Sequence, residues 1–141
     1  MPQVVAERRL IALGAGLVLL AMLVGLVVGQ FPHVPLLLSA HLAATMGGTL
    51  MVAVGAGLHK LALSDSLRGW LVWTLAGSGY LNLVATVLGA ALGTSGLTPI
   101  HGAGTAGLAA EGLVAALLVV MVVCTFASLG LLLRGALTTE R

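Results

Sequence analysis

One histidine lies inside a long apolar stretch and is the residue best placed for chemistry. His41 falls within 36–58, where no other side chain is ionisable. An ionisable side chain inside a membrane span is costly, so it usually pairs with a neighbouring group or has a function. Imidazole is well suited to holding a metal or a haem iron. The residues alone leave two interpretations open: a hydrogen bond to a neighbouring helix, or a ligand or catalytic role.

The composition predicts the environment in which this histidine works. Hydrophobic residues make up 60% of the 141 residues and charged residues 7%. A soluble domain of this length could not cover so much apolar surface with so few charges, which indicates a membrane protein in a lipid bilayer. The net charge of +2 is the difference between six basic and four acidic residues, and the basic residues do not cluster on a polar face. Nucleic-acid binding is therefore not predicted.

Four apolar segments reach the roughly 20 residues that a membrane-spanning helix needs. They are 10–28, 36–58, 69–92 and 108–133. The first follows Arg8 and Arg9, but it is long for a signal-peptide core and no small-residue cleavage site follows it. The sequence therefore predicts an all-α, four-helix transmembrane bundle that forms one domain over 1–141.

The basic residues predict the orientation of this bundle. They lie before the first span, between the second and third, and after the fourth: Arg8, Arg9, Lys60, Arg68, Arg134 and Arg141. The loops 29–35 and 93–107 contain no Lys or Arg. Because positively charged loops stay in the cytoplasm, we expect a multi-pass protein of the cell inner membrane with both termini cytoplasmic.

Unusual polar side chains then gather in the outer half of the membrane. His41 is expected about 7–8 Å below the outer boundary at 1.5 Å per residue. Asn82 and Thr86 lie in the outer half of the third span, Tyr80 near its middle, and Glu111 near the outer start of the fourth. Polar groups at one depth on three helices are typical of a buried site. For His33 and His101, on the outer loops, a solvated loop position is the favoured interpretation.

Small residues recur along the spans and predict close helix packing. On the third span they form one stripe with two polar residues: Gly79, Asn82, Thr86, Gly89 and Gly93. Similar rows are Ala40, Ala44 and Gly48 on the second span and Ala21, Gly25 and Gly29 on the first. Tyr80 lies about 200° around the helix from Asn82, so the two side chains cannot face the same neighbouring helix. These rows offer more close-packing faces than a lone bundle needs, which favours a homo-oligomer.

Three short motifs resemble a known family. They are SAHL at Ser39–Leu42, GYLN at Gly79–Asn82, and GTSGLTPIHGAGTAG over 93–107. This pattern resembles the hydroxylaminobenzene mutase family, which are small four-helix bacterial membrane proteins. The same skeleton is similar to that of the styrene oxide isomerases, which are more distant relatives. The resemblance runs from the first span to the fourth.

This resemblance implies a cofactor and its ligand. Styrene oxide isomerases are haem b proteins that assemble as trimers, with haem near the subunit interfaces. Their axial histidine lies in an A-H motif early in the second helix and corresponds to His41. Thr45, one turn after His41, and Thr86 are accordingly expected beside the cofactor. Two positions depart from the family pattern: Gly47 stands where an Asn is usual, and Thr86 where the epoxide isomerases have a Tyr. These departures put styrene oxide itself in doubt as the substrate.

The resemblance also implies the reaction. A single imidazole ligand at His41 leaves one position of a haem iron open, as a Lewis-acid catalyst requires. Asn82 and Tyr80 are then expected to orient a small aromatic hydroxylamine, or to stabilise charge, while it rearranges within one molecule. A non-catalytic electron-transfer haem protein is the main alternative, with His33 or His101 as second ligand. A small transporter or accessory subunit is a further alternative.

Overall fold

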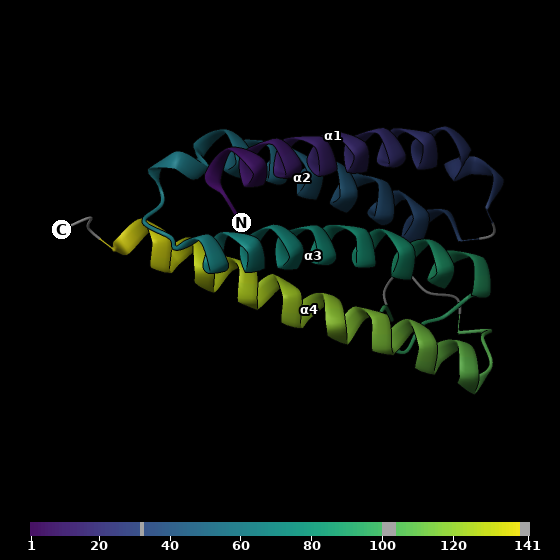
Figure 1. Ribbon diagram of the computed structural model, residues 1–141. Helices are drawn as coiled ribbons and strands as arrows, with labels where there is room; N and C mark the ends of the chain where they lie inside the picture. Colours follow the sequence, from purple (N-terminus) through teal and green to yellow (C-terminus); the bar gives the residue numbers. More distant parts are fainter. Residues whose placement is uncertain (32, 100–103, 139–141) are drawn as a thin grey trace.

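Four long helices lie side by side in an antiparallel bundle (Figure 1). The computed structural model describes residues 1–31, 33–99 and 104–138. The helices are α1 (Gln3–Val27), α2 (Val34–Gly57), α3 (Asp65–Leu92) and α4 (Leu108–Leu137), and short 3₁₀ turns follow α1 (Val28–Gln30) and α2 (Leu58–Lys60). All four are long and apolar enough to cross a membrane. The predicted all-α architecture with four membrane helices is confirmed.

Local residue chemistry accounts for the start of α2 and for both ends of α3. α2 begins two residues earlier than the predicted span, because Pro35 suits the first turn of a helix, where its missing N–H is not needed. Ser64 precedes α3 and its hydroxyl accepts a hydrogen bond from the Leu67 N–H at 3.5 Å. α3 stops at Gly93, whose φ of +74° is a left-handed conformation that favours glycine.

The basic residues share one end of the bundle, where α1 begins and α4 ends (Figure 1). Among the described residues these are Arg8, Arg9, Lys60, Arg68 and Arg134, and Arg141 lies outside the described ranges. We call this the basic end, and we call the opposite end, where α1 meets α2 and α3 meets α4, the loop end. The cytoplasmic location of the basic end stays a prediction.

The helices pack as two pairs, α1 with α2 and α3 with α4, and α3 joins the pairs by contacting both α1 and α2 (Figure 1). The larger cluster of buried apolar residues comes mainly from α1, α2 and α3. A smaller cluster, Ala85 with Val114 and Leu118, joins α3 to α4. α4 therefore has the most peripheral position, and apolar side chains such as Phe126, 74% exposed, project from it.

Glycines let α1 and α2 approach closely. A Cβ atom built on Gly14 would lie 2.6 Å from the Gly48 carbonyl oxygen, and one built on Gly48 would lie 2.6 Å from the Gly14 carbonyl oxygen. A Cβ on Gly55 would meet the Glu7 carbonyl oxygen at 3.1 Å. The small residues of the second span are thus largely used within the chain. They do not by themselves provide a free face for a second copy.

Candidate active site

His41 lies seven residues into α2, about 10 Å along the helix at 1.5 Å per residue. Its half-buried ring packs against α1, and its Nδ1 atom lies 2.7 Å from the Ala21 carbonyl oxygen. Gly25, one turn further along α1, provides the space for the ring. A Cβ atom there would lie 2.8 Å from Nδ1 and 2.9 Å from Cε1 of His41.

The Ala21 bond determines which ring nitrogen of His41 carries hydrogen. A carbonyl oxygen only accepts hydrogen bonds, so Nδ1 must be the donor. In a neutral imidazole, Nε2 then carries the free lone pair. Metal-ligating histidines are commonly oriented in this way, with one nitrogen donating to a carbonyl and the other free for a metal. The bond to a neighbouring helix and the ligand role, which the sequence left as alternatives, are therefore compatible.

Thr45 lies one helical turn after His41 and is half-buried. Its hydroxyl donates to the His41 carbonyl oxygen at 2.8 Å, and the Thr49 hydroxyl donates to the Thr45 carbonyl at the same distance. Such bonds satisfy a threonine hydroxyl within its own helix. Gly47 is the position at which the resembled family has an Asn. A Cβ atom built on Gly47 would lie 3.9 Å from the Gly79 Cα atom.

Asn82 and Thr86 line a cleft on the other side of the molecule, between α3 and α4. The cleft has a volume of about 450 Å³. Its remaining lining consists of Leu97 and Thr98 from the loop between these helices, and Leu118, Val119, Met121, Val122 and Val123 from α4. The described residues that line it include no charged side chain. This is a cleft for a mainly apolar, neutral ligand.

The amide of Asn82 is the polar group that a helix presents to a ligand in this cleft. The Thr86 hydroxyl is 7% exposed and donates within α3, to the Asn82 carbonyl at 2.6 Å and the Leu83 carbonyl at 3.2 Å. In the described part of the chain, the side-chain amide of half-buried Asn82 makes no such bond. An amide carries both donors and an acceptor, so it can orient a substrate with a hydroxyl or an amine.

Tyr80 points to a different neighbour. Its hydroxyl donates to the Leu13 carbonyl oxygen of α1 at 2.9 Å, and a Cβ atom on Gly16 would lie 3.1 Å from that hydroxyl. Tyr80 thus faces α1 whereas Asn82 faces the cleft with α4, as their separation around the helix predicts. This hydrogen bond ties α3 to α1.

The predicted site residues consequently fall on two sides of one chain. His41 is on the α1–α2 side, and Asn82 and Thr86 are on the α3–α4 side. Of the two loop histidines, His101 lies outside the described residues. His33 precedes α2 and is half-buried, with its Nε2 atom 3.1 Å from the position of a Cβ atom on Gly93.

Sequence reasoning did not identify three features of this arrangement. In the sequence, Gly25 is recognisable only as a small residue for helix packing, and its spacing carries no sign that it makes room for an imidazole ring. Leu97 and Thr98 lie in a loop without periodicity, so their place in the cleft had no signal. Glu111 stood out as a carboxylate near a helix start, but its partners are the backbone N–H groups of Ser95 and Gly96. Backbone partners leave no pattern in side-chain types.

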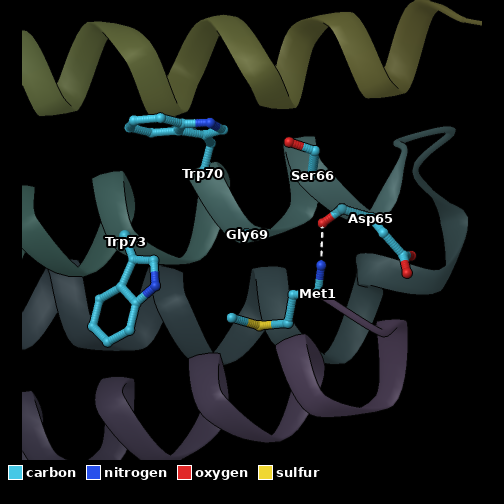
Figure 2. A pocket seen from close by; sticks show the side chains of 6 residues that line it. All are labelled: Met1, Asp65, Ser66, Gly69, Trp70 and Trp73. Carbon is cyan, nitrogen blue, oxygen red and sulfur yellow. Dashed lines mark hydrogen bonds between the residues drawn. The ribbon is translucent and has the colours of Figure 1, made fainter.

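At the basic end, Figure 2 shows a shallow pocket formed by Met1 and residues of the first turns of α3. Trp70 and Trp73 line it, and the guanidinium of Arg9 lies 6.0 Å from the centre of the Trp73 ring. Tryptophan rings are common at membrane–water boundaries. This pocket is at the opposite end of the helices from His41 and Asn82 and contains neither of them.

Comparison with known proteins agrees with this arrangement of motifs. The chain is 34% identical over 131 residues to "Hydroxylaminobenzene mutase HabB" of Ectopseudomonas oleovorans, which covers 88% of this chain and 80% of that protein. No solved structure matches the chain significantly. Residues 6–137 match the sequence model of the family described as styrene oxide isomerase. Since this match covers nearly the whole chain, the protein belongs to the styrene oxide isomerase family.

Proposed function

We propose that this protein is a membrane-embedded mutase that rearranges a small aromatic hydroxylamine to an aminophenol. The similarity to a hydroxylaminobenzene mutase over most of the chain supports this reaction class. In such a rearrangement the N–O bond breaks, a C–O bond forms on the ring, and the ring proton is lost while the nitrogen gains one. The formula is unchanged, so no oxidant or reductant is consumed.

The observation that carries the proposal is the orientation of His41. Its Nδ1 is held by the Ala21 carbonyl, so that a free lone pair on Nε2 is available to one metal. No cluster of three or more metal-binding side chains occurs among the described residues, but a haem needs a single axial histidine. His41 would therefore hold a haem b. When bound, this group would supply a Lewis acid for the substrate oxygen.

The residues of the α3–α4 cleft would hold the substrate. Its apolar lining accepts an aromatic ring and excludes water, which would otherwise trap an electrophilic intermediate. The Asn82 amide would orient the N–OH group and hydrogen-bond the oxygen as charge develops on it. The absence of charged groups from the described lining favours a neutral substrate.

We further propose that the active site is completed by a second copy of the chain. His41 packs against α1, whereas the Asn82 cleft opens between α3 and α4, so the two sides of one chain would meet in a homo-oligomer. The resemblance to haem isomerases favours a trimer. Apolar α4 side chains beside the cleft, such as Val123 at 62% exposed, would then be covered by the neighbour.

Replacing His41 tests this function most directly. His41→Ala should abolish haem absorbance and the conversion of hydroxylaminobenzene to aminophenol, with insertion preserved because the span becomes more apolar. Absorbance spectra of the purified protein and chromatography of the product provide the two measurements. His33→Ala and His101→Ala are matched controls and should leave both nearly unchanged.

Three outcomes would contradict the proposal. Loss of haem in His101→Ala with retention in His41→Ala would move the ligand to the loop end. A low-spin bis-histidine spectrum that does not respond to an aromatic hydroxylamine would favour electron transfer. A native mass showing only monomer would reject a site completed by a second copy.

A further inference from the structure

Glu111 lies in the first turn of α4 and bridges to the loop that precedes this helix. One carboxylate oxygen accepts a hydrogen bond from the Ser95 N–H at 2.7 Å, and the other accepts one from the Gly96 N–H at 2.9 Å. Hydrogen bonds to a charged group are stronger than those between neutral groups. Gly96 permits this approach, because a Cβ atom at that position would lie 2.9 Å from the carboxylate.

The two residues that Glu111 holds are followed directly by two that line the cleft. Leu97 and Thr98 form the part of the cleft lining that comes from the loop rather than from a helix. A turn ties this segment to itself, since the Thr98 N–H donates to the Ser95 carbonyl at 3.1 Å. The position of Leu97 and Thr98 over the cleft thus depends on where Ser95 and Gly96 are held.

We propose that Glu111 is a positioning residue that fixes the segment 95–98 as the outer wall of the α3–α4 cleft, and that this wall limits the size of the aromatic compound admitted. The aromatic class of the ligand rests on the proposed function. The positioning of 95–98 rests on the two hydrogen bonds that Glu111 accepts, which we call the latch. Glu111 does not line the cleft, so it acts through Leu97 and Thr98 rather than on the substrate.

The cleft volume makes the wall relevant to size. A closed cavity of about 150 Å³ is enough for benzene in a protein interior. The cleft measures about 450 Å³, so its volume alone does not exclude a second fused ring, and the position of Leu97 and Thr98 determines how far such a ring can extend. Leu97 is 56% exposed, so burial alone holds it weakly, and the two hydrogen bonds of Glu111 keep its segment in place.

Amide hydrogen exchange in lipid nanodiscs tests the latch without requiring turnover. Glu111→Ala should speed exchange at Ser95 and Gly96 by about 10–100-fold, because both acceptors are lost. Glu111→Gln keeps one acceptor oxygen and should give an intermediate rate. Gly96→Ala should also speed exchange, because the added methyl displaces the intact carboxylate. Glu7→Ala is the matched control, since Glu7 is a carboxylate at the basic end that accepts from Gln3, and it should leave these amides unchanged.

Steady-state kinetics test the wall. In Glu111→Ala the KM for hydroxylaminobenzene should rise about tenfold while kcat changes by less than about twofold, because binding contacts and not reacting groups are lost. The preference for hydroxylaminobenzene over 1-hydroxylaminonaphthalene, measured as the ratio of kcat/KM values, should fall. Leu97→Ala leaves Glu111 intact and should lower the same preference, which keeps the test decisive if Glu111→Ala does not fold.

Unchanged exchange at Ser95 and Gly96 in a folded Glu111→Ala protein would overturn the latch. Faster exchange with unchanged KM and unchanged size preference would overturn the wall. A wild-type protein without turnover would instead reject the proposed function. In that case saturation-transfer NMR can measure the binding of aniline and 1-aminonaphthalene, with empty nanodiscs as the control. Stronger binding of the larger amine by Leu97→Ala would support the wall, and unchanged binding would overturn it.

Discussion

The two helix pairs of this protein differ in how closely their helices approach each other. Between α1 and α2, Gly14 and Gly48 bring the backbones so close that a Cβ atom on either would clash with the other's carbonyl oxygen. Between α3 and α4, in contrast, a Cβ atom on Gly77 would meet the Cys124 sulfur at 3.4 Å, an ordinary contact, and a cleft of about 450 Å³ remains near Asn82.

This difference separates two tasks that a membrane catalyst must perform. The close packing of α1 against α2 leaves little room, so Ala21 and Gly25 hold the His41 imidazole in a single orientation. A loosely packed pair leaves space for a ligand, at the cost of fewer van der Waals contacts between its helices. Under the proposed function, rigid placement of a cofactor ligand and space for a substrate would thus belong to different helix pairs.

The largest effect on the cleft side should follow the loss of its amide. Asn82→Ala should retain haem and lower kcat by about 10²–10³-fold, as removal of a donor to a developing oxyanion does. Rate measurements on protein of matched haem content provide the check. Ser78→Ala is the control on the same helix, because its hydroxyl donates to the Leu75 carbonyl at 2.8 Å and should not affect turnover. Loss of haem in Asn82→Ala would place Asn82 on the cofactor side of the comparison.

On the α1–α2 side, the largest effect apart from the loss of His41 itself should come from filling the space that Gly25 leaves for the His41 ring. Gly25→Ala places a methyl 2.8 Å from Nδ1 of His41 and should displace the ring from the Ala21 carbonyl. Loss of such a supporting bond typically lowers metal affinity by about 10–100-fold. Haem titration of the apoprotein measures this. Gly29→Ala, in the same row with no atom within 4 Å of the added Cβ, should leave the affinity unchanged. Equal haem affinities in the two variants would contradict the proposed role of Gly25.

The sequence predicts the parts of this architecture that depend on side-chain type. Four apolar runs predict the four helices, because a membrane span has a minimum length and an apolar composition. The angle between successive residues predicts that Tyr80 and Asn82 face different neighbours, and they do, toward α1 and toward the α4 cleft. A lone histidine in an apolar run leaves two alternatives for His41, a hydrogen bond to a neighbouring helix or a ligand role, and the structure shows the hydrogen bond, to the Ala21 carbonyl.

The sequence cannot predict features that depend on backbone atoms or on distance. A row of glycines has the same pattern whether it faces a backbone, as Gly48 does, or an imidazole, as Gly25 does. For this reason small-residue rows that favoured an oligomer are largely used inside the chain. Likewise, the outer-half depth shared by His41 and Asn82 predicts a common site, whereas contacts place them on different sides of the molecule.

Stability measurements should reveal the difference in packing directly. Gly48→Ala inserts a methyl that meets a backbone oxygen at 2.6 Å, so α1 and α2 must separate. Overpacking of this kind costs about 1–3 kcal/mol in the free energy of unfolding. Gly77→Ala on α3 adds a Cβ that meets the Cys124 sulfur of α4 at 3.4 Å, an ordinary contact, and should be neutral or slightly stabilising. Denaturant titration in mixed micelles compares the two variants. An equal loss of stability in both would show that the pairs are packed alike.

The smallest expected effect concerns the hydroxyl that links the two pairs. Tyr80→Phe removes the hydrogen bond from α3 to the Leu13 carbonyl of α1 while keeping the ring. The Leu13 carbonyl keeps its helical partner, so the free energy of unfolding should fall by only about 0.5–1.5 kcal/mol. If Tyr80 acts mainly by tying α3 to α1, turnover should fall by less than about tenfold, because Asn82 remains in its cleft. Loss of turnover well beyond tenfold at unchanged stability would instead make Tyr80 a reacting group, as the family resemblance implies. Since one variant yields both values, the ratio of the two losses decides between a structural and a catalytic hydroxyl.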